Sequence, residues 1–87
     1  MSNLYSRYFQ ATLLREKIWF VVGALKSQEN LCFDRAIDPE NNRFEFFVPE
    51  QRVTEFLDCI RLFEEQKMVT HFEELPNRIL LQKMMPN

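Results

Sequence analysis

The side chains that could carry out chemistry are few in this chain, and they lie far apart in the sequence. It has one histidine, His71, and two cysteines, Cys32 and Cys59. Nucleophilic catalysis needs a nucleophile, a base and a group that orients the base. Cys59 falls inside a predicted helix and is expected to be packed, and His71 falls in a predicted strand and is expected to be partly exposed. We therefore expect no enzyme activity, and a small enzyme without a recognisable motif stays open as an alternative.

Metal and phosphate sites are not indicated either. His71, Glu73 and Glu74 are close in sequence, but only His71 and Glu73 share a face of the predicted strand. Two ligands are fewer than a stable protein metal site uses. Phosphate-binding loops need several glycines, and the only glycine here is Gly23. No metal and no other cofactor is expected.

The amino-acid composition bears on whether the chain binds nucleic acid and on where in the cell it is found. The formal net charge is −2, with no block of basic residues, so binding to a nucleic-acid backbone is not favoured. No apolar run is long enough to span a membrane, and the first residues do not form a signal peptide. The widely spaced cysteines are typical of reduced thiols in a cytoplasmic protein. The length predicts one domain over residues 1–87, with a core at 4–75 and an apolar tail at 78–87.

The first half of the chain predicts a strand, a helix and a second strand. Residues 4–14 alternate apolar and polar side chains, which predicts a strand. Residues 15–26 carry apolar side chains at helical spacing, which predicts a helix, and their β-branched residues leave a strand as the alternative. The buried stripe of that helix is Ile18, Val21, Val22 and Leu25, and Trp19 and Phe20 widen or flank it. Gly23 lies inside the helix and is expected to let another element approach closely. Residues 31–38 predict the next strand.

A hairpin is expected around the turn at residues 38–43, where proline and two asparagines favour a reversal. A four-residue loop would pair Arg35 with Phe46 and Phe33 with Val48. That register places Phe33 and Ile37 on the core face, and it places Arg35 there as an anomaly. Arg35 is then expected either to extend along an edge strand to water or to bind an anion or a partner.

The second half predicts a strand at residues 43–48, a helix at 50–67 and a strand at 69–74. The helix repeats apolar residues at helical spacing, at Val53, Phe56, Leu57, Ile60 and Phe63. The tail is apolar, with Ile79, Leu80 and Met84 among its residues. Such a segment is expected to cover a groove of its own domain or to pack on another chain.

The order strand, helix, strand, strand, helix, strand predicts an α+β fold. Two right-handed crossovers joined by a hairpin give a ferredoxin-like βαββαβ two-layer sandwich, in which a four-stranded antiparallel sheet carries two helices on one face. The other face should have no helix. Its expected side chains are Tyr8, Gln10, Thr12, Asp34, Ala36, Glu45, Phe47 and His71.

Two stretches resemble known families. The run Arg35-Ala36-Ile37-Asp38-Pro39 precedes a strand that ends in Val48-Pro49-Glu50 and an amphipathic helix. This layout resembles ACT-like regulatory domains, and especially short uncharacterised bacterial proteins of similar length; it implies a regulatory role and a small-molecule effector. ACT domains share a glycine in the turn after the first strand, and residues 13–17 have none. Residues 42–48 look distantly like the third-strand motif of RNA-recognition domains.

The main functional prediction is a non-catalytic binding or regulatory module that forms homo-oligomers or binds another protein, because the open sheet face and the tail expose apolar groups. The alternative is a single-stranded RNA binder that stacks bases on Tyr8 and Phe47. The candidate interaction surface is Tyr8, Arg35, Phe47, His71, Ile79, Leu80 and Met84.

Overall fold

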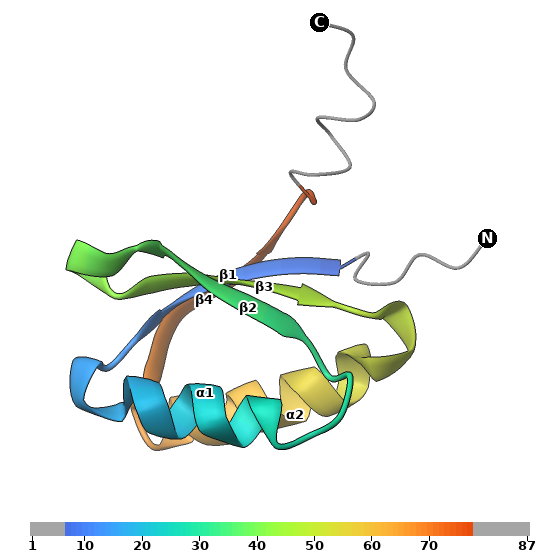
Figure 1. Cartoon of the computed structure of the whole chain (residues 1–87), viewed down its shortest axis with the longest axis horizontal. Helices are drawn as coiled ribbons and strands as arrows, with labels where there is room; N and C mark the ends of the chain where they lie inside the picture. Colours follow the sequence, from blue (N-terminus) through green and yellow to red (C-terminus); the bar gives the residue numbers. More distant parts are fainter. Residues whose placement is uncertain (1–6, 78–87) are drawn as a thin grey trace, which may run out of the picture.

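Six helices and strands follow one another in the predicted order in the computed structural model, which describes residues 7–77. They are β1 (Arg7–Leu13), α1 (Ile18–Lys26), β2 (Phe33–Asp38), β3 (Arg43–Val48), α2 (Val53–Glu65) and β4 (Val69–Leu75). The strands form one antiparallel sheet in the order β2-β3-β1-β4. Both helices lie on the same side of this sheet (Figure 1). The ferredoxin-like α+β fold is thus confirmed.

Aromatic rings fill the space between the sheet and the helices. Phe56 of α2 packs on Phe9 and Phe46 of the two central strands, with ring centroids 5.1 and 5.5 Å apart. Phe72 of β4 stacks on Phe9 at 5.3 Å. Each fully buried ring of this kind stabilises the fold by roughly 1.5–3 kcal/mol. This cluster joins β1, β3 and β4 to α2.

Short 3-10 turns lead into both helices and connect the hairpin. They are η1 (Arg15–Lys17), η2 (Pro39–Asn41) and η3 (Glu50–Arg52). The predicted helix at residues 15–26 is therefore one 3-10 turn followed by α1, and the predicted helix at 50–67 begins in the same way. Asn42 ends η2 in the left-handed region, with φ 55°, a conformation that asparagine tolerates.

Asp38 lies opposite Arg43 beside the hairpin turn, but beyond Ile37 the predicted register of β2 and β3 is wrong by one residue. Arg35 lies opposite Glu45, and Phe33 lies opposite Phe47. The register shifts between Ala36 and Asp38, so Ile37 is the additional residue of a β-bulge. Because side chains alternate along a strand, a shift of one residue moves them to the opposite face.

This shift corrects the side-chain assignments along β2. Arg35 and Phe33 lie on the face without helices, and Phe33 is 52% exposed rather than part of the core. Asp34 and Ala36 lie opposite Phe46 and Phe44, on the helix side, and not on the open face as predicted. The anomaly of an arginine on the core face therefore disappears.

The interpretation of Gly23 also changes. It was expected to let a strand or helix approach, but a Cβ atom added there would meet no described atom within 4 Å. Gly23 lies on the exposed side of α1, facing away from the sheet. Nothing in residues 7–77 explains a glycine at this helical position.

None of the helices in the described residues is long and apolar enough to cross a membrane.

Candidate interaction surfaces

A buried carboxylate lies at the centre of the sheet face that carries no helix. Glu45 of β3 is 0% exposed, and its Oε1 accepts a hydrogen bond of 2.7 Å from Tyr8 Oη. Arg35 of β2 donates Nε and Nη2 to Oε2 of the same carboxylate, at 2.9 and 2.7 Å. Gln10 Nε2 in turn donates to Tyr8 Oη at 2.9 Å. These bonds offset the large cost of removing a carboxylate from water.

The structure brings Tyr8 and Phe47 together with Arg35, which was expected on the other face, and it buries the two rings. Tyr8 is 2% exposed and Phe47 is 4% exposed, with ring centroids 5.0 Å apart. The guanidinium of Arg35 is an ion-pair partner of Glu45. An aromatic platform that stacks RNA bases needs accessible rings, so these exposures do not favour the RNA-binding alternative.

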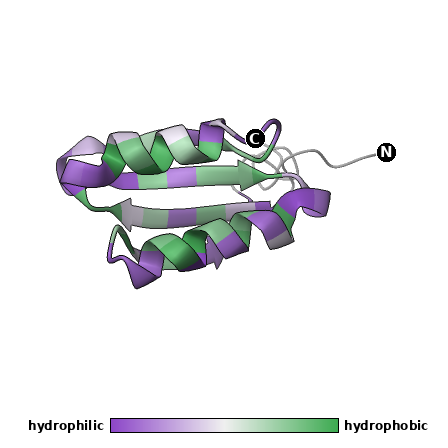
Figure 2. Ribbon diagram, turned by 90° about the horizontal axis from the view of Figure 1, so that it is seen from below, coloured by the Kyte–Doolittle hydropathy of each residue, from purple (hydrophilic) through white to green (hydrophobic). Residues whose placement is uncertain are grey.

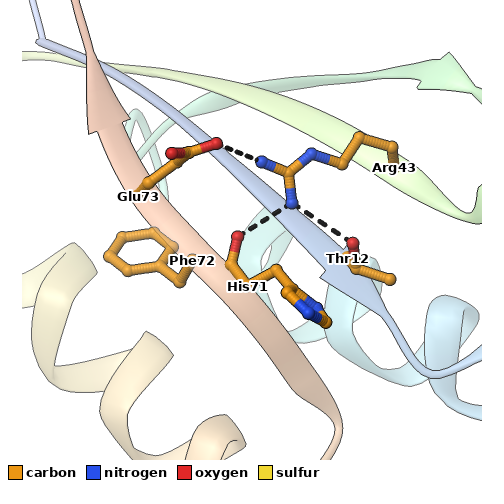
Figure 3. A pocket seen from close by; sticks show the side chains of 5 residues that line it. All are labelled: Thr12, Arg43, His71, Phe72 and Glu73. Carbon is orange, nitrogen blue, oxygen red and sulfur yellow. Dashed lines mark hydrogen bonds and ion pairs between the residues drawn. The ribbon is translucent and has the colours of Figure 1, made fainter.

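His71 lies away from these residues, beside a small hollow at the other end of the sheet (Figure 3). The Arg43 guanidinium reaches across the strands and donates to Thr12 Oγ1, to the His71 carbonyl and to Glu73, at 3.2, 2.8 and 2.6 Å. The register of β1 and β4 shifts here, and His71 has a φ of 49°. Arg43 thus holds the bulge in β4 through a hydrogen bond to the backbone carbonyl of His71. The imidazole of His71 is exposed at the surface.

The cysteines form no reactive pair with a base in the described part of the chain. Burial, followed by the nearby charges of Asp34 and Cys59, raises the pKa of Cys32 to about 12. A thiol with this pKa is protonated at neutral pH and is a poor nucleophile. Cys59 Sγ accepts a hydrogen bond of 3.0 Å from Gln28. Within residues 7–77, no group of three or more metal-binding side chains comes together.

The most exposed large apolar side chains are found on the helices instead. Trp19 is 87% exposed, Phe20 58% and Leu62 62%. Figure 2 views the molecule from this side and shows apolar segments on both helices. Phe20 contacts Phe63, the neighbour of Leu62, edge-on at 6.2 Å. Gly23 lies one helical turn beyond Trp19 and Phe20 on the same outer side. We call Trp19, Phe20, Gly23 and Leu62 the helical surface.

The sequence of α1 has more apolar residues than a helix on a sheet can bury, and this excess indicates an exposed apolar surface. Residues 18–22 are apolar at five consecutive positions, whereas a helix that covers one sheet face needs an apolar stripe of about 100°. The surplus apolar residues, Trp19 and Phe20, must therefore face outward. The pattern alone does not reveal that neighbouring elements leave them uncovered.

The two helices run antiparallel, so the helical surface has defined ends. Phe20 near the start of α1 contacts Phe63 near the end of α2. At the other end, Arg52 before α2 donates to the carbonyl of Glu29 after α1, at 2.6 Å. The start of α1 thus lies beside the end of α2.

The predicted surface residues Ile79, Leu80 and Met84 lie outside the described residues. Comparison of this chain with protein-family models, with curated proteins and with solved structures finds no match.

Proposed function

We propose that this chain is a non-catalytic binding or regulatory module that self-associates through its helical surface. The observation that carries the proposal is the 87% exposure of Trp19, together with the exposure of Phe20 and Leu62 on the same helices. Aromatic side chains are the largest contributors to protein interfaces, and exposed clusters of apolar residues mark interaction sites. Covering this surface removes it from water.

Charge favours a second copy of the chain as the partner. Residues 15–26 are basic, with Arg15, Lys17 and Lys26 against Glu16. Residues 50–65 are acidic, with Glu50, Glu55, Asp58, Glu64 and Glu65 against Arg52 and Arg61. A surface that carries both a basic and an acidic helix is complementary to itself, as a two-fold interface requires.

The antiparallel helices fix how two copies fit. A two-fold axis along the helices stacks α1 on α2 of the second copy. Trp19 then lies near Leu62 of the second copy, and Lys17 near its Glu65. Gly23 lies on the outer side of α1, where the absence of a side chain lets the second copy approach closely.

The finer parts of the proposal have separate support. The ferredoxin-like topology is compatible with the ACT-like resemblance, which favours a regulatory role and a small-molecule effector. The free thiols of Cys32 and Cys59 favour a cytoplasmic location.

The single tryptophan makes self-association directly measurable. As protein concentration rises from about 1 to several hundred micromolar, we expect the fluorescence of Trp19 to shift to shorter wavelength while the sedimenting mass doubles. Phe20→Ser and Leu62→Ser should each weaken association at least tenfold. The control is Ile37→Ser, which alters a side chain 39% exposed at the bulge of the edge strand β2.

The result contradicting the proposal is a sedimenting mass of one chain over the whole concentration range. Equal weakening by Ile37→Ser and Phe20→Ser would also contradict it, because the interface would then not be the helical surface. Circular dichroism of each variant confirms that a loss of association is not a loss of folding.

A further inference from the structure

A groove lies between the start of α1 and the turn of the β2–β3 hairpin, at one end of the molecule (Figure 1). Its volume is about 620 Å³, within the range of roughly 300–1,000 Å³ that small-molecule sites occupy. The α1 side contributes Arg15, Ile18 and Trp19, and the hairpin turn contributes Pro39, Glu40 and Asn42. We call these six residues the Trp19 groove.

Backbone hydrogen bonds hold the two sides of the groove together. The Leu13 amide, at the end of β1, donates to the Asn42 carbonyl at 3.0 Å. The Asn42 amide donates to the Pro39 carbonyl at 3.3 Å, which closes the hairpin turn. The Lys17 amide donates to the Leu14 carbonyl at 2.9 Å, which closes the turn that leads into α1. A ligand therefore meets walls that are already in place, and this lowers the cost of binding.

Three side chains of the groove have different chemistry and no partner in the part of the chain that the structure describes. The indole of Trp19 is 87% exposed. The guanidinium of Arg15 and the carboxylate of Glu40 are exposed as well, and neither forms a hydrogen bond or an ion pair within residues 7–77. The groove thus offers a flat aromatic ring, one cation and one anion to a ligand.

Each of these three groups favours a different part of a ligand. A planar base stacks on an exposed indole. A carboxylate only accepts hydrogen bonds, so Glu40 favours a ring edge with N–H donors. The guanidinium of Arg15 favours a phosphate. Guanine nucleotides combine these parts, because the Watson–Crick edge of guanine presents two adjacent N–H groups, whereas adenine presents one N–H group beside an acceptor nitrogen.

We propose that the Trp19 groove binds a free guanine mononucleotide. The base stacks on Trp19 with its Watson–Crick edge toward Glu40, and the phosphate pairs with Arg15. Arg15 is the one cation among the described residues that line the groove, which suits one phosphate rather than an RNA backbone. As an effector, the nucleotide rests on the regulatory role proposed above, whereas its binding requires no self-association.

Trp19 is the only tryptophan of the chain, so its fluorescence reports binding directly. The protein, at about 1 µM, is titrated with guanosine monophosphate, with guanosine and with adenosine monophosphate. The same titrations of N-acetyltryptophanamide correct for the light that the nucleotides absorb. We expect saturable quenching by guanosine monophosphate with a Kd below about 1 mM, and at least fivefold weaker binding of the other two compounds.

Variants assign the two charged contacts. Arg15→Gln should weaken binding of guanosine monophosphate at least tenfold and binding of guanosine less than twofold, because only the first compound carries a phosphate. Glu40→Gln should remove the preference for guanine over adenine, because an amide donates as well as accepts hydrogen bonds. The control is Arg61→Gln, which alters an exposed arginine of α2 and should change neither constant.

Quenching by guanosine monophosphate that only matches the quenching of N-acetyltryptophanamide overturns the proposal. Equal binding of guanosine and adenosine monophosphates by the wild type also overturns it, as does equal weakening by Arg15→Gln and Arg61→Gln. A sedimenting mass of one chain at every concentration contradicts the proposed self-association but leaves these binding constants unchanged, so the failures of the two proposals are distinguishable.

Discussion

Glu45 is the residue whose surroundings are most restrictive. Its carboxylate is fully buried and is paired with the guanidinium of Arg35. Sequence reasoning treated Glu45 as an open-face residue and Arg35 as a core-face anomaly, and both acquire one explanation once the Ile37 bulge sets the register. The pair fixes β2 to β3 on the face that the helices do not support.

Removal of the Arg35 side chain should destabilise the fold more than removal of an exposed arginine. Arg35→Ala removes an ion pair from the buried carboxylate of Glu45, and we expect the free energy of unfolding to fall by about 2–4 kcal/mol. The matched control is Arg61→Ala, whose pair with Asp58 is 67% and 65% exposed and should contribute less than about 1 kcal/mol. Equal losses in urea unfolding would show that Glu45 does not need Arg35.

A second ion pair predicts a dependence on pH. The hydrogen bond from Arg7, together with its charge, holds the pKa of Glu74 below its ordinary value. A carboxyl whose pKa is lower in the folded state contributes stability above its unfolded pKa, and this contribution is lost as the pH falls through the folded pKa. Arg7→Gln should therefore be less stable than the wild type at pH 7.

The difference in unfolding free energy between wild type and Arg7→Gln should shrink as the pH falls below about 4.3, the ordinary pKa of glutamate. Arg7→Gln also removes the ion pair between Arg7 and Glu50. Thermal unfolding between pH 7 and pH 2.5 measures it, with Arg61→Gln as the control. A difference that stays constant over this range would mean that packing, rather than charge, explains the effect of Arg7.

At the scale of elements, the end of α2 shows a local conflict between sequence and backbone. The Met68 and Lys67 amides donate to the carbonyls of Phe63 and Glu64, both at 2.9 Å, which is the hydrogen-bond pattern of a Schellman cap. Lys67 takes the left-handed conformation that this cap requires, with φ 62°. Glycine is the residue that adopts it without steric strain.

Lys67→Gly should therefore raise the free energy of unfolding by about 1 kcal/mol. Lys67→Ala serves as the control, because it removes the charge but keeps the Cβ atom, and it should not stabilise the fold. Urea unfolding of the three proteins measures the difference. Equal stabilisation by alanine and glycine would assign the effect to charge rather than to backbone conformation.

The elements themselves could be predicted because their signals are local. Alternation in residues 43–48 and helical spacing in 53–63 each fall within one element. The β2 register could not be predicted, because the bulge at Ile37 is one residue that leaves the local composition unchanged. The exposure of Trp19 could not be predicted either, because it depends on which elements pack around α1. The pairing of Glu45 with Arg35 was missed for the same reason as the register.

At the scale of the whole molecule, the two sides of the sheet differ in a way that the sequence did not indicate. The side without helices carries a buried polar network and the buried rings of Tyr8 and Phe47, whereas the helical side carries the exposed rings of Trp19 and Phe20. The sequence analysis placed the interaction surface on the sheet face without helices, whereas the proposed interface lies on the helices. The orientation of two copies can be tested by charge.

Charge reversal tests whether the contact between two copies depends on the opposite charges of α1 and α2. A variant with Lys17→Glu and Lys26→Glu makes α1 acidic, and a variant with Asp58→Lys and Glu65→Lys makes α2 basic. Neither should self-associate, because like charges then meet at both helix contacts. An equimolar mixture should form heterodimers, because each reversed helix meets its opposite charge. Sedimentation of the separate and mixed proteins at low salt gives the result; self-association of either variant alone, or a mixture that stays monomeric, would contradict the stacking of α1 on α2.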